Sequence, residues 1–147
     1  MFSPVWRFVV EPKSVKEEEL NDRCDGNYIQ WLGYRSDVPD LLRSSHIIAF
    51  PSYYREGVPK SLIEATAIGR PIVTTNSIGC KDTVEDGVNG FLIPIKDSKA
   101  LAEKLRILID DADLRKRMGL NSRQIAERDF SLDDVIAKHL AIYELMY

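Results

Sequence analysis

The sequence lacks the marks of a membrane or secreted protein. No apolar run approaches the ~20 residues that cross a bilayer, and the longest, residues 47–50, has only the length of a strand. The N-terminus shows no basic-then-apolar signal pattern, since Pro4 and Arg7 interrupt it. These absences predict a cytoplasmic chain.

The sequence also has little that would hold a polyanion or a metal. Its net charge is −3, which argues against a broad basic face and against a nucleic-acid partner. A small anion is still compatible, because a few backbone amides can hold one. Cys24 and Cys80 are far apart, and His46 and His139 are equally isolated. We therefore expect two reduced thiols and no metal site.

Short apolar runs alternate along the chain with longer amphipathic segments. Strands are expected at residues 5–10, 28–32, 47–50, 71–75 and 91–95. Helices are expected at 14–23, 37–44, 59–68, 98–109, 114–128 and 132–146, with one helical turn within 79–85. The strands are continuously apolar, as in parallel sheets that are covered on both faces. The pattern predicts an α/β domain, residues 1–147, with a doubly wound, mostly parallel sheet and a helical C-terminus.

Ligands bind such sheets beyond the carboxyl ends of the strands. The loops of interest therefore follow Leu32, Phe50, Thr75 and Ile95.

The loop after the third strand leads into a helix that begins without a side-chain cap. Pro59 suits the first helical position, which would make Val58 the N-cap, and valine has no side-chain acceptor. Gly57 lets the backbone approach a ligand closely. The amides expected to start without a partner from the cap are those of Lys60, Ser61 and Leu62. This positively polarised terminus suits a diphosphate; the alternative is that water or the Glu56 carboxylate caps it.

Two glutamates flank this terminus. Glu64 lies about one and a half turns into the helix, and its side chain leans towards the N-terminus. It is placed to accept hydrogen bonds from a ribose diol, or it is a solvated or locally paired helix glutamate. Glu56 precedes the helix, where the dipole favours a carboxylate in either case.

The whole string resembles a known family. Its motifs are Glu56-Gly57-Val58-Pro59 with Glu64-Ala65, Gly69-Arg70-Pro71-Ile72-Val73, Trp31-Leu32-Gly33-Tyr34-Arg35 and Asp86-Gly87-Val88-Asn89-Gly90-Phe91-Leu92. They are similar to the C-terminal domain of retaining glycosyltransferases of the GT-B fold, family four (group 1). The form of residues 51–59 resembles bacterial capsule, O-antigen and lipid-linked-oligosaccharide transferases, many of which use UDP-sugars. The resemblance covers nearly the whole chain and implies a Rossmann-like fold.

The resemblance also implies roles for individual residues. Glu56 would be the catalytic residue, stabilising charge near the anomeric carbon of the donor sugar. The donor would be held by Gly57, Val58, Pro59, Lys60, Ser61 and Leu62, its ribose by Glu64, and its base would border Gly33, Tyr34 and Arg35. The alternative for Tyr34 and Arg35 is an exposed loop. Neither a metal nor another cofactor is expected, because helix dipoles and cationic side chains offset the leaving-group charge.

The chain departs from the family pattern at its start. The strand and helix that normally supply an Arg and a Lys to the donor phosphates are not found upstream of Val5, and Glu11-Pro12 replaces the usual glycines. We expect a piece truncated at its N-terminal edge, without the acceptor domain through which a parent enzyme would contact a membrane. The expected parent reaction moves a hexose or acetamidohexose from a nucleoside diphosphate, UDP favoured, to a lipid-linked or glycan acceptor. The alternatives are a nucleotide-sugar-binding module without turnover, or a GT-B nucleotide-sugar epimerase.

Overall fold

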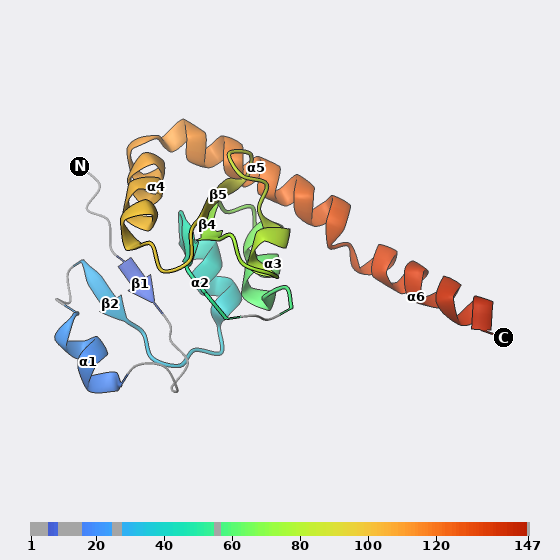
Figure 1. Ribbon diagram of the computed structural model, residues 1–147, viewed down its shortest axis with the longest axis horizontal. Coiled ribbons are helices and arrows are strands. Elements are labelled where there is room, and N and C mark those ends of the chain that lie inside the picture. The colour runs from blue at the N-terminus through green and yellow to red at the C-terminus, as the bar shows by residue number, and fades with distance from the viewer. Residues whose placement is uncertain (1–5, 9–15, 25–27, 55–56, 147) are drawn as a thin grey trace. The chain divides into compact units, whose positions relative to one another are not determined.

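The protein is described here from a computed structural model, which covers residues 6–8, 16–24, 28–54 and 57–146 (Figure 1). The strands are β1 (Trp6–Phe8), β2 (Ile29–Trp31), β3 (Ile48–Phe50), β4 (Ile72–Thr75) and β5 (Gly90–Ile93). The helices are α1 (Glu17–Asp22), α2 (Val38–Ser44), α3 (Lys60–Ala67), the 3-10 helix η1 (Cys80–Thr83), α4 (Ser98–Asp110), α5 (Ala112–Asp129) and α6 (Leu132–Met146). This order confirms the predicted alternation of strands and helices.

The chain divides into two compact units, Met1–Val38 and Pro39–Tyr147. In the first unit, β1 and β2 pair in parallel, with Trp6 opposite Ile29. Helix α1 lies between them in the sequence, as a parallel connection requires. The expectation of a single domain over residues 1–147 stays a prediction.

The second unit contains a parallel sheet in the order β3-β4-β5. All four residues of β4 are buried. Because successive strand residues point to opposite faces, burial of all four means that both faces of β4 are covered. Figure 1 shows α3 and α4 flanking this sheet. The predicted doubly wound α/β arrangement with a helical C-terminus is confirmed.

The core of this unit joins the sheet to the two helices that follow it. Val73 and Ile93 pack with Leu108 of α4 and Met118 of α5, and all four side chains are buried. Leu108 lies within the segment 98–109 that was expected to be helical, and it is buried. Burying an aliphatic side chain of this size contributes roughly 1.5–3 kcal/mol.

Several element boundaries differ from the prediction for identifiable reasons. Strand β5 ends at Ile93 because Pro94 has no N–H to continue the ladder. It begins at Gly90, where a Cβ atom would lie 1.9 Å from the carbonyl oxygen of Ile72. Helix α5 begins at Ala112, not at 114, because the Asp111 carboxylate accepts a hydrogen bond from the amide of Leu114 (2.7 Å).

Glycine permits the close packing of α3 against α5. Gly69 follows Ile68, the C-cap residue of α3, and its φ of 75° is the left-handed conformation typical of a C′ glycine. Its amide donates to Thr66 O, and the amide of Arg70 donates to Ala65 O, which is the Schellman pattern. Gly119 of α5 faces it: a Cβ on Gly119 would lie 2.5 Å from the Gly69 carbonyl oxygen.

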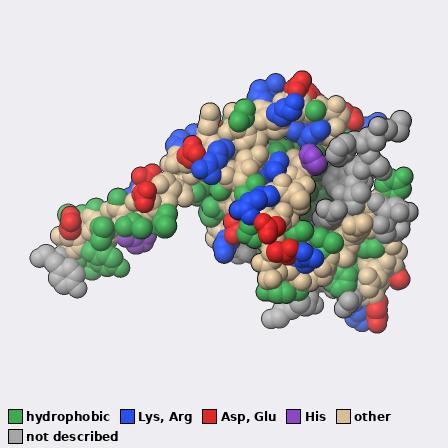
Figure 2. Space-filling model, turned by 180° about the vertical axis from the view of Figure 1, so that it is seen from behind, with side chains coloured by type: hydrophobic (Ala, Val, Ile, Leu, Met, Phe, Trp, Pro, Cys, Tyr) green, Lys and Arg blue, Asp and Glu red, His purple; other side chains and the backbone are tan. Residues whose placement is uncertain are grey.

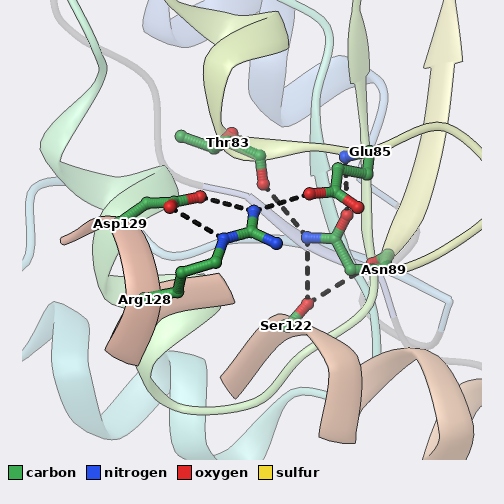
Figure 3. Close-up of polar contacts among 6 residues, drawn as sticks. All are labelled: Thr83, Glu85, Asn89, Ser122, Arg128 and Asp129. Atoms are coloured by element: carbon green, nitrogen blue, oxygen red, sulfur yellow. Dashed lines mark hydrogen bonds and ion pairs between the residues drawn. The ribbon is translucent and has the colours of Figure 1, made fainter. Parts of the chain in front are cut away.

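A buried polar network fixes the turn that leads into β5 (Figure 3). The amide group of Asn89 donates to the carbonyl oxygen of Thr83 (3.0 Å) and to the hydroxyl of Ser122 (3.3 Å), and its oxygen accepts from the backbone amide of Glu85 (2.8 Å). Ser122 in turn donates to the carbonyl oxygen of Arg70 (2.7 Å). Both Asn89 and Ser122 are completely buried, so the network satisfies polar groups that water does not reach.

Helix α6 differs from the others because none of its described residues is buried. Its apolar residues, among them Val135, Leu140 and Tyr143, are exposed along it (Figure 2). Over the described part of the chain, no helix is both long enough and apolar enough to span a membrane.

Candidate functional site

The site lies at the edge of the three-stranded sheet where β3, β4 and β5 end. Because these strands are parallel, the loops that follow them leave from the same edge. Two threonines at the end of β4 hold the last residue of β3 and the loop that follows it. The hydroxyl of Thr74 donates to the carbonyl oxygen of Phe50 (2.7 Å), and that of Thr75 donates to the carbonyl oxygen of Ser52.

The N-terminus of α3 opens at this edge, but the helix starts one residue later than predicted. Pro59, not Val58, is the N-cap, because its ψ of 128° is extended. Its carbonyl oxygen accepts from the amide of Leu62 (3.0 Å), which is therefore already bonded. The prediction that the Leu62 amide starts unpartnered is wrong. The amides that remain candidates for a ligand in the first turn are those of Lys60 and Ser61, since the cap residue has no side-chain acceptor.

Glu64 lies one turn into α3 with its side chain 27% exposed. Its Oε1 is 3.6 Å from Nζ of Lys60, whose side chain is 88% exposed. Residues at i and i+4 share a helix face. Glu64 is therefore paired within its own helix, as expected for a locally paired helix glutamate. So exposed a pair contributes little to stability. It does place a carboxylate and an ammonium together at the open end of the helix.

Two further residues of the predicted site are exposed beside this terminus. Gly57 and Val58 are both exposed, and a Cβ on Gly57 would meet nothing within 4 Å. The protein itself therefore does not require a glycine here, and close approach of a ligand stays a prediction. Glu56, the predicted catalytic residue, lies outside the described residues.

The three residues predicted to border a base, Gly33, Tyr34 and Arg35, belong to the first unit. Gly33 has φ 65°, and Tyr34 is 86% exposed. The guanidinium of Arg35 donates to both carboxylate oxygens of Asp37 (2.5 and 2.7 Å). This hydrogen bonding lowers the pKa of Asp37 below its ordinary value. Tyr34 is thus an exposed loop residue in this structure, which agrees with the alternative interpretation.

The structure also brings together residues that the sequence reasoning did not connect. Tyr53 and Tyr54 stack with ring centroids 4.6 Å apart, and Nζ of Lys96 lies 4.9 Å from the centroid of Tyr53. The hydrogen bond with Tyr53 raises the pKa of Tyr54. The adjacent tyrosines were visible in the sequence, but Lys96 follows a different strand, so only the parallel pairing brings it near.

A metal centre was not expected. Within residues 6–8, 16–24, 28–54 and 57–146, no group of three or more His, Cys, Asp or Glu side chains is placed to hold a metal ion.

These features define a class: a doubly wound α/β unit that presents an open helix N-terminus, a half-buried glutamate and loop tyrosines at the carboxyl edge of its sheet. Within that class, residues 11–125 match the profile of the glycosyl transferases group 1 family. The chain belongs to this family.

Individual relatives agree with this assignment. The chain is 34% identical over 121 residues to the N,N'-diacetylbacillosaminyl-diphospho-undecaprenol alpha-1,3-N-acetylgalactosaminyltransferase of Campylobacter jejuni, covering 76% of this chain and 32% of that protein. It is 41% identical over 96 residues to the capsular polysaccharide biosynthesis glycosyltransferase CapM of Staphylococcus aureus, covering 65% and 25%. Among solved structures, Anabaena HepE in complex with UDP superposes with a TM-score of 0.82 and 26% identity, covering 94% of this chain and 41% of that one. HepE in complex with UDP-glucose aligns at 30% identity with a TM-score of 0.70, covering 78% and 32%. The chain thus spans about a third or less of the length of these two curated relatives.

Proposed function

We propose that this chain binds the nucleotide-sugar donor of a retaining glycosyltransferase, with UDP as the favoured nucleotide. The observation that carries the proposal is the N-terminus of α3. It opens at the carboxyl edge of the sheet with no side-chain acceptor at its cap, and the half-buried carboxylate of Glu64 lies one turn above it. The HepE complexes with UDP and UDP-glucose support the choice of ligand.

In this proposal the first turn of α3 binds the diphosphate. The helix dipole and the amides of Lys60 and Ser61 attract the phosphate oxygens. The exposed ammonium of Lys60 is a further cation at the same terminus. When the donor binds, this ammonium leaves the Glu64 carboxylate and pairs with a phosphate oxygen instead. Glu64, released from Lys60, accepts hydrogen bonds from the ribose hydroxyls.

Transfer itself is proposed for a longer protein. The donor sugar would be a hexose or acetamidohexose, with Glu56 beside it and a further domain binding a lipid-linked or glycan acceptor. The C. jejuni relative, whose name includes an undecaprenol diphosphate, supports a lipid-linked acceptor. By itself the chain is expected to bind the donor without turnover. Neither donor binding nor sugar transfer is expected to require a metal ion.

The test is a thermal-shift titration of the chain with UDP, GDP, ADP and TDP, each to several millimolar. A dissociation constant on the order of 10⁻⁴ to 10⁻³ M is expected for the preferred nucleotide. Such binding raises the melting temperature by up to a few degrees at the highest concentrations. We expect Glu64→Ala to lose the shift and Lys60→Ala to weaken binding by about 10-fold, the loss of one charge-assisted hydrogen bond. Glu103→Ala, which removes an exposed glutamate of α4, is the matched control. A shift that survives in Glu64→Ala would remove Glu64 from the site, and no shift with any nucleotide would contradict donor binding by this chain.

A further inference from the structure

The stacked tyrosines at the carboxyl edge are not part of the core. Tyr53 is 49% exposed and Tyr54 is 53% exposed, so burial does not explain why the two rings are held together. Their planes are inclined by 25°, and the hydroxyl of Tyr53 donates to that of Tyr54 (3.4 Å). The stack therefore presents aromatic surface and two hydroxyls to solvent.

Lys96 holds this stack from a second loop. It follows β5 and has φ 60°, the only positive φ of a non-glycine residue within the described part of the chain. A lysine is strained there where a glycine would not be. The conformation places Nζ 4.9 Å from the ring centroid of Tyr53, a cation–π distance. Backbone strain that positions a charged group beside a ligand edge points to binding, because folding alone does not favour it.

The base of the stack is fixed. Thr75 donates to the carbonyl oxygen of Ser52, immediately before Tyr53, and the amide of Tyr54 donates to the hydroxyl of Ser52 (3.4 Å). The rings thus stand on a loop tied to the central strand, so they are ordered before any ligand arrives. Pre-ordered aromatic groups lose little conformational entropy on binding.

We propose that Tyr53, Tyr54 and Lys96, here called the aromatic platform, bind the pyranose ring of a sugar diphosphate. The C–H face of a pyranose packs on an aromatic ring, while the tyrosine hydroxyls and the Lys96 ammonium are hydrogen-bonding groups for sugar hydroxyls or phosphate oxygens. This inference rests on the proposed function and names the part of the site that recognises the sugar. The ligand chemistry, a hexose on a diphosphate, occurs both in a nucleotide-sugar donor and in a lipid-linked acceptor.

The experiment separates these two sources by calorimetry on the whole chain. One arm compares UDP-glucose and UDP-GlcNAc with UDP, and the other uses GlcNAc on a short-chain prenyl diphosphate against the prenyl diphosphate alone. Tyr54→Ala removes the outer ring, Tyr54→Phe keeps it, and Lys96→Gly removes the ammonium in a residue suited to this φ. Tyr143→Ala, at an exposed tyrosine of α6, is the matched control.

We expect Tyr54→Ala to weaken binding of the sugar-bearing ligand by about 3- to 10-fold in one arm, with UDP and prenyl diphosphate unchanged. Tyr54→Phe should retain most of the affinity, and the affected arm identifies the source of the sugar. Equal weakening of UDP and UDP-sugar would overturn the inference, since the platform would then serve the nucleotide or the fold. No change in either arm would overturn it as well.

Failure of the proposed function is recognised separately. Saturation-transfer NMR with GlcNAc 1-phosphate tests the platform without a nucleotide. Suppose that UDP does not bind. Saturation transfer to the ring protons of GlcNAc 1-phosphate, seen in the wild-type chain and abolished in Tyr54→Ala, would still support the platform. No such transfer in the wild-type chain would contradict the platform.

Discussion

Gly69 and Gly119 face each other so closely that a methyl group on Gly119 would lie 2.5 Å from the carbonyl oxygen of Gly69. The contact brings the end of α3 against the middle of α5, and it thereby fixes the helix whose other end opens at the candidate site. Two glycines allow this approach because neither carries a Cβ atom.

Gly119→Ala should therefore destabilise the chain although alanine is the better helix former. Overpacking against a backbone oxygen costs about 1–3 kcal/mol, and the propensity gain of up to about 1 kcal/mol offsets only part of it. Urea unfolding measures the net change in the free energy of unfolding. Leu120→Ala, at a 68% exposed neighbour on the same helix, is the control and should change it little. A Gly119→Ala variant as stable as wild type would contradict the close packing.

The Asn89–Ser122 pair should show energetic coupling. Either alanine substitution leaves buried backbone groups without a partner, at about 1–3 kcal/mol for each group. Because the two side chains share a hydrogen bond and both serve the turn into β5, removing both should cost less than the sum of the single losses. A double-mutant cycle by urea unfolding gives the coupling directly. Strict additivity would show that the two residues act independently.

The Arg128–Asp129 ion pair should make a small contribution to stability that is lost in acid. Hydrogen bonding from Arg128 lowers the pKa of Asp129 below its ordinary 3.8. The folded chain then holds this proton less readily than the unfolded chain does, so the stabilisation is complete above that value. It disappears as the pH falls through the lowered pKa. Arg128 also donates to the carboxylate of Glu85 (2.6 Å), so Arg128→Ala removes both contacts.

Comparison of wild type with Arg128→Ala in urea between pH 7 and pH 2 tests this expectation. The difference between their midpoints should be small, because the pair is exposed, and it should vanish as the pH falls through the lowered pKa of Asp129, which lies below 3.8. Arg106→Ala is a suitable control, since Arg106 lies 3.8 Å from Asp110 and is 85% exposed. A difference that grows in acid would have the wrong sign for this mechanism.

Nucleotide binding should not depend on a divalent cation. In the proposed site the helix dipole and Lys60 offset the phosphate charge, so EDTA should leave the thermal shift with UDP unchanged. The same titration with and without magnesium measures this. A shift that appears only with the metal would mean that the phosphates are neutralised by an ion and not by α3.

Much of the fold was predictable because local signals and topology agreed. The apolar run that became β4 predicted a strand covered on both faces. The helix expected at 98–109 begins at Ser98, where the carboxylate of Asp97 accepts from the amide of Ala100 (2.9 Å). The start of α3 was misplaced by one residue because proline suits both the N-cap and the first helical position. Its ψ decides between them, and ψ depends on the loop that precedes it.

Contacts between distant segments were not predictable from the sequence. Lys96 reaches Tyr53 only because β3 and β5 lie parallel on either side of β4, and its positive φ carries no sequence signal as it would at a glycine. Likewise, the repeated Thr74-Thr75 indicated a strand by β propensity, but nothing in it predicted which carbonyl groups the hydroxyls would bind.

The two threonine hydroxyls hold the end of β3 and the loop after it by main-chain carbonyl groups, not by side chains. Substitutions in residues 51–54 can therefore change what the loop displays without releasing it from the central strand. Such an attachment separates the evolution of ligand choice from the maintenance of the scaffold: the loop can be refitted to a new ligand while β4 keeps it in place.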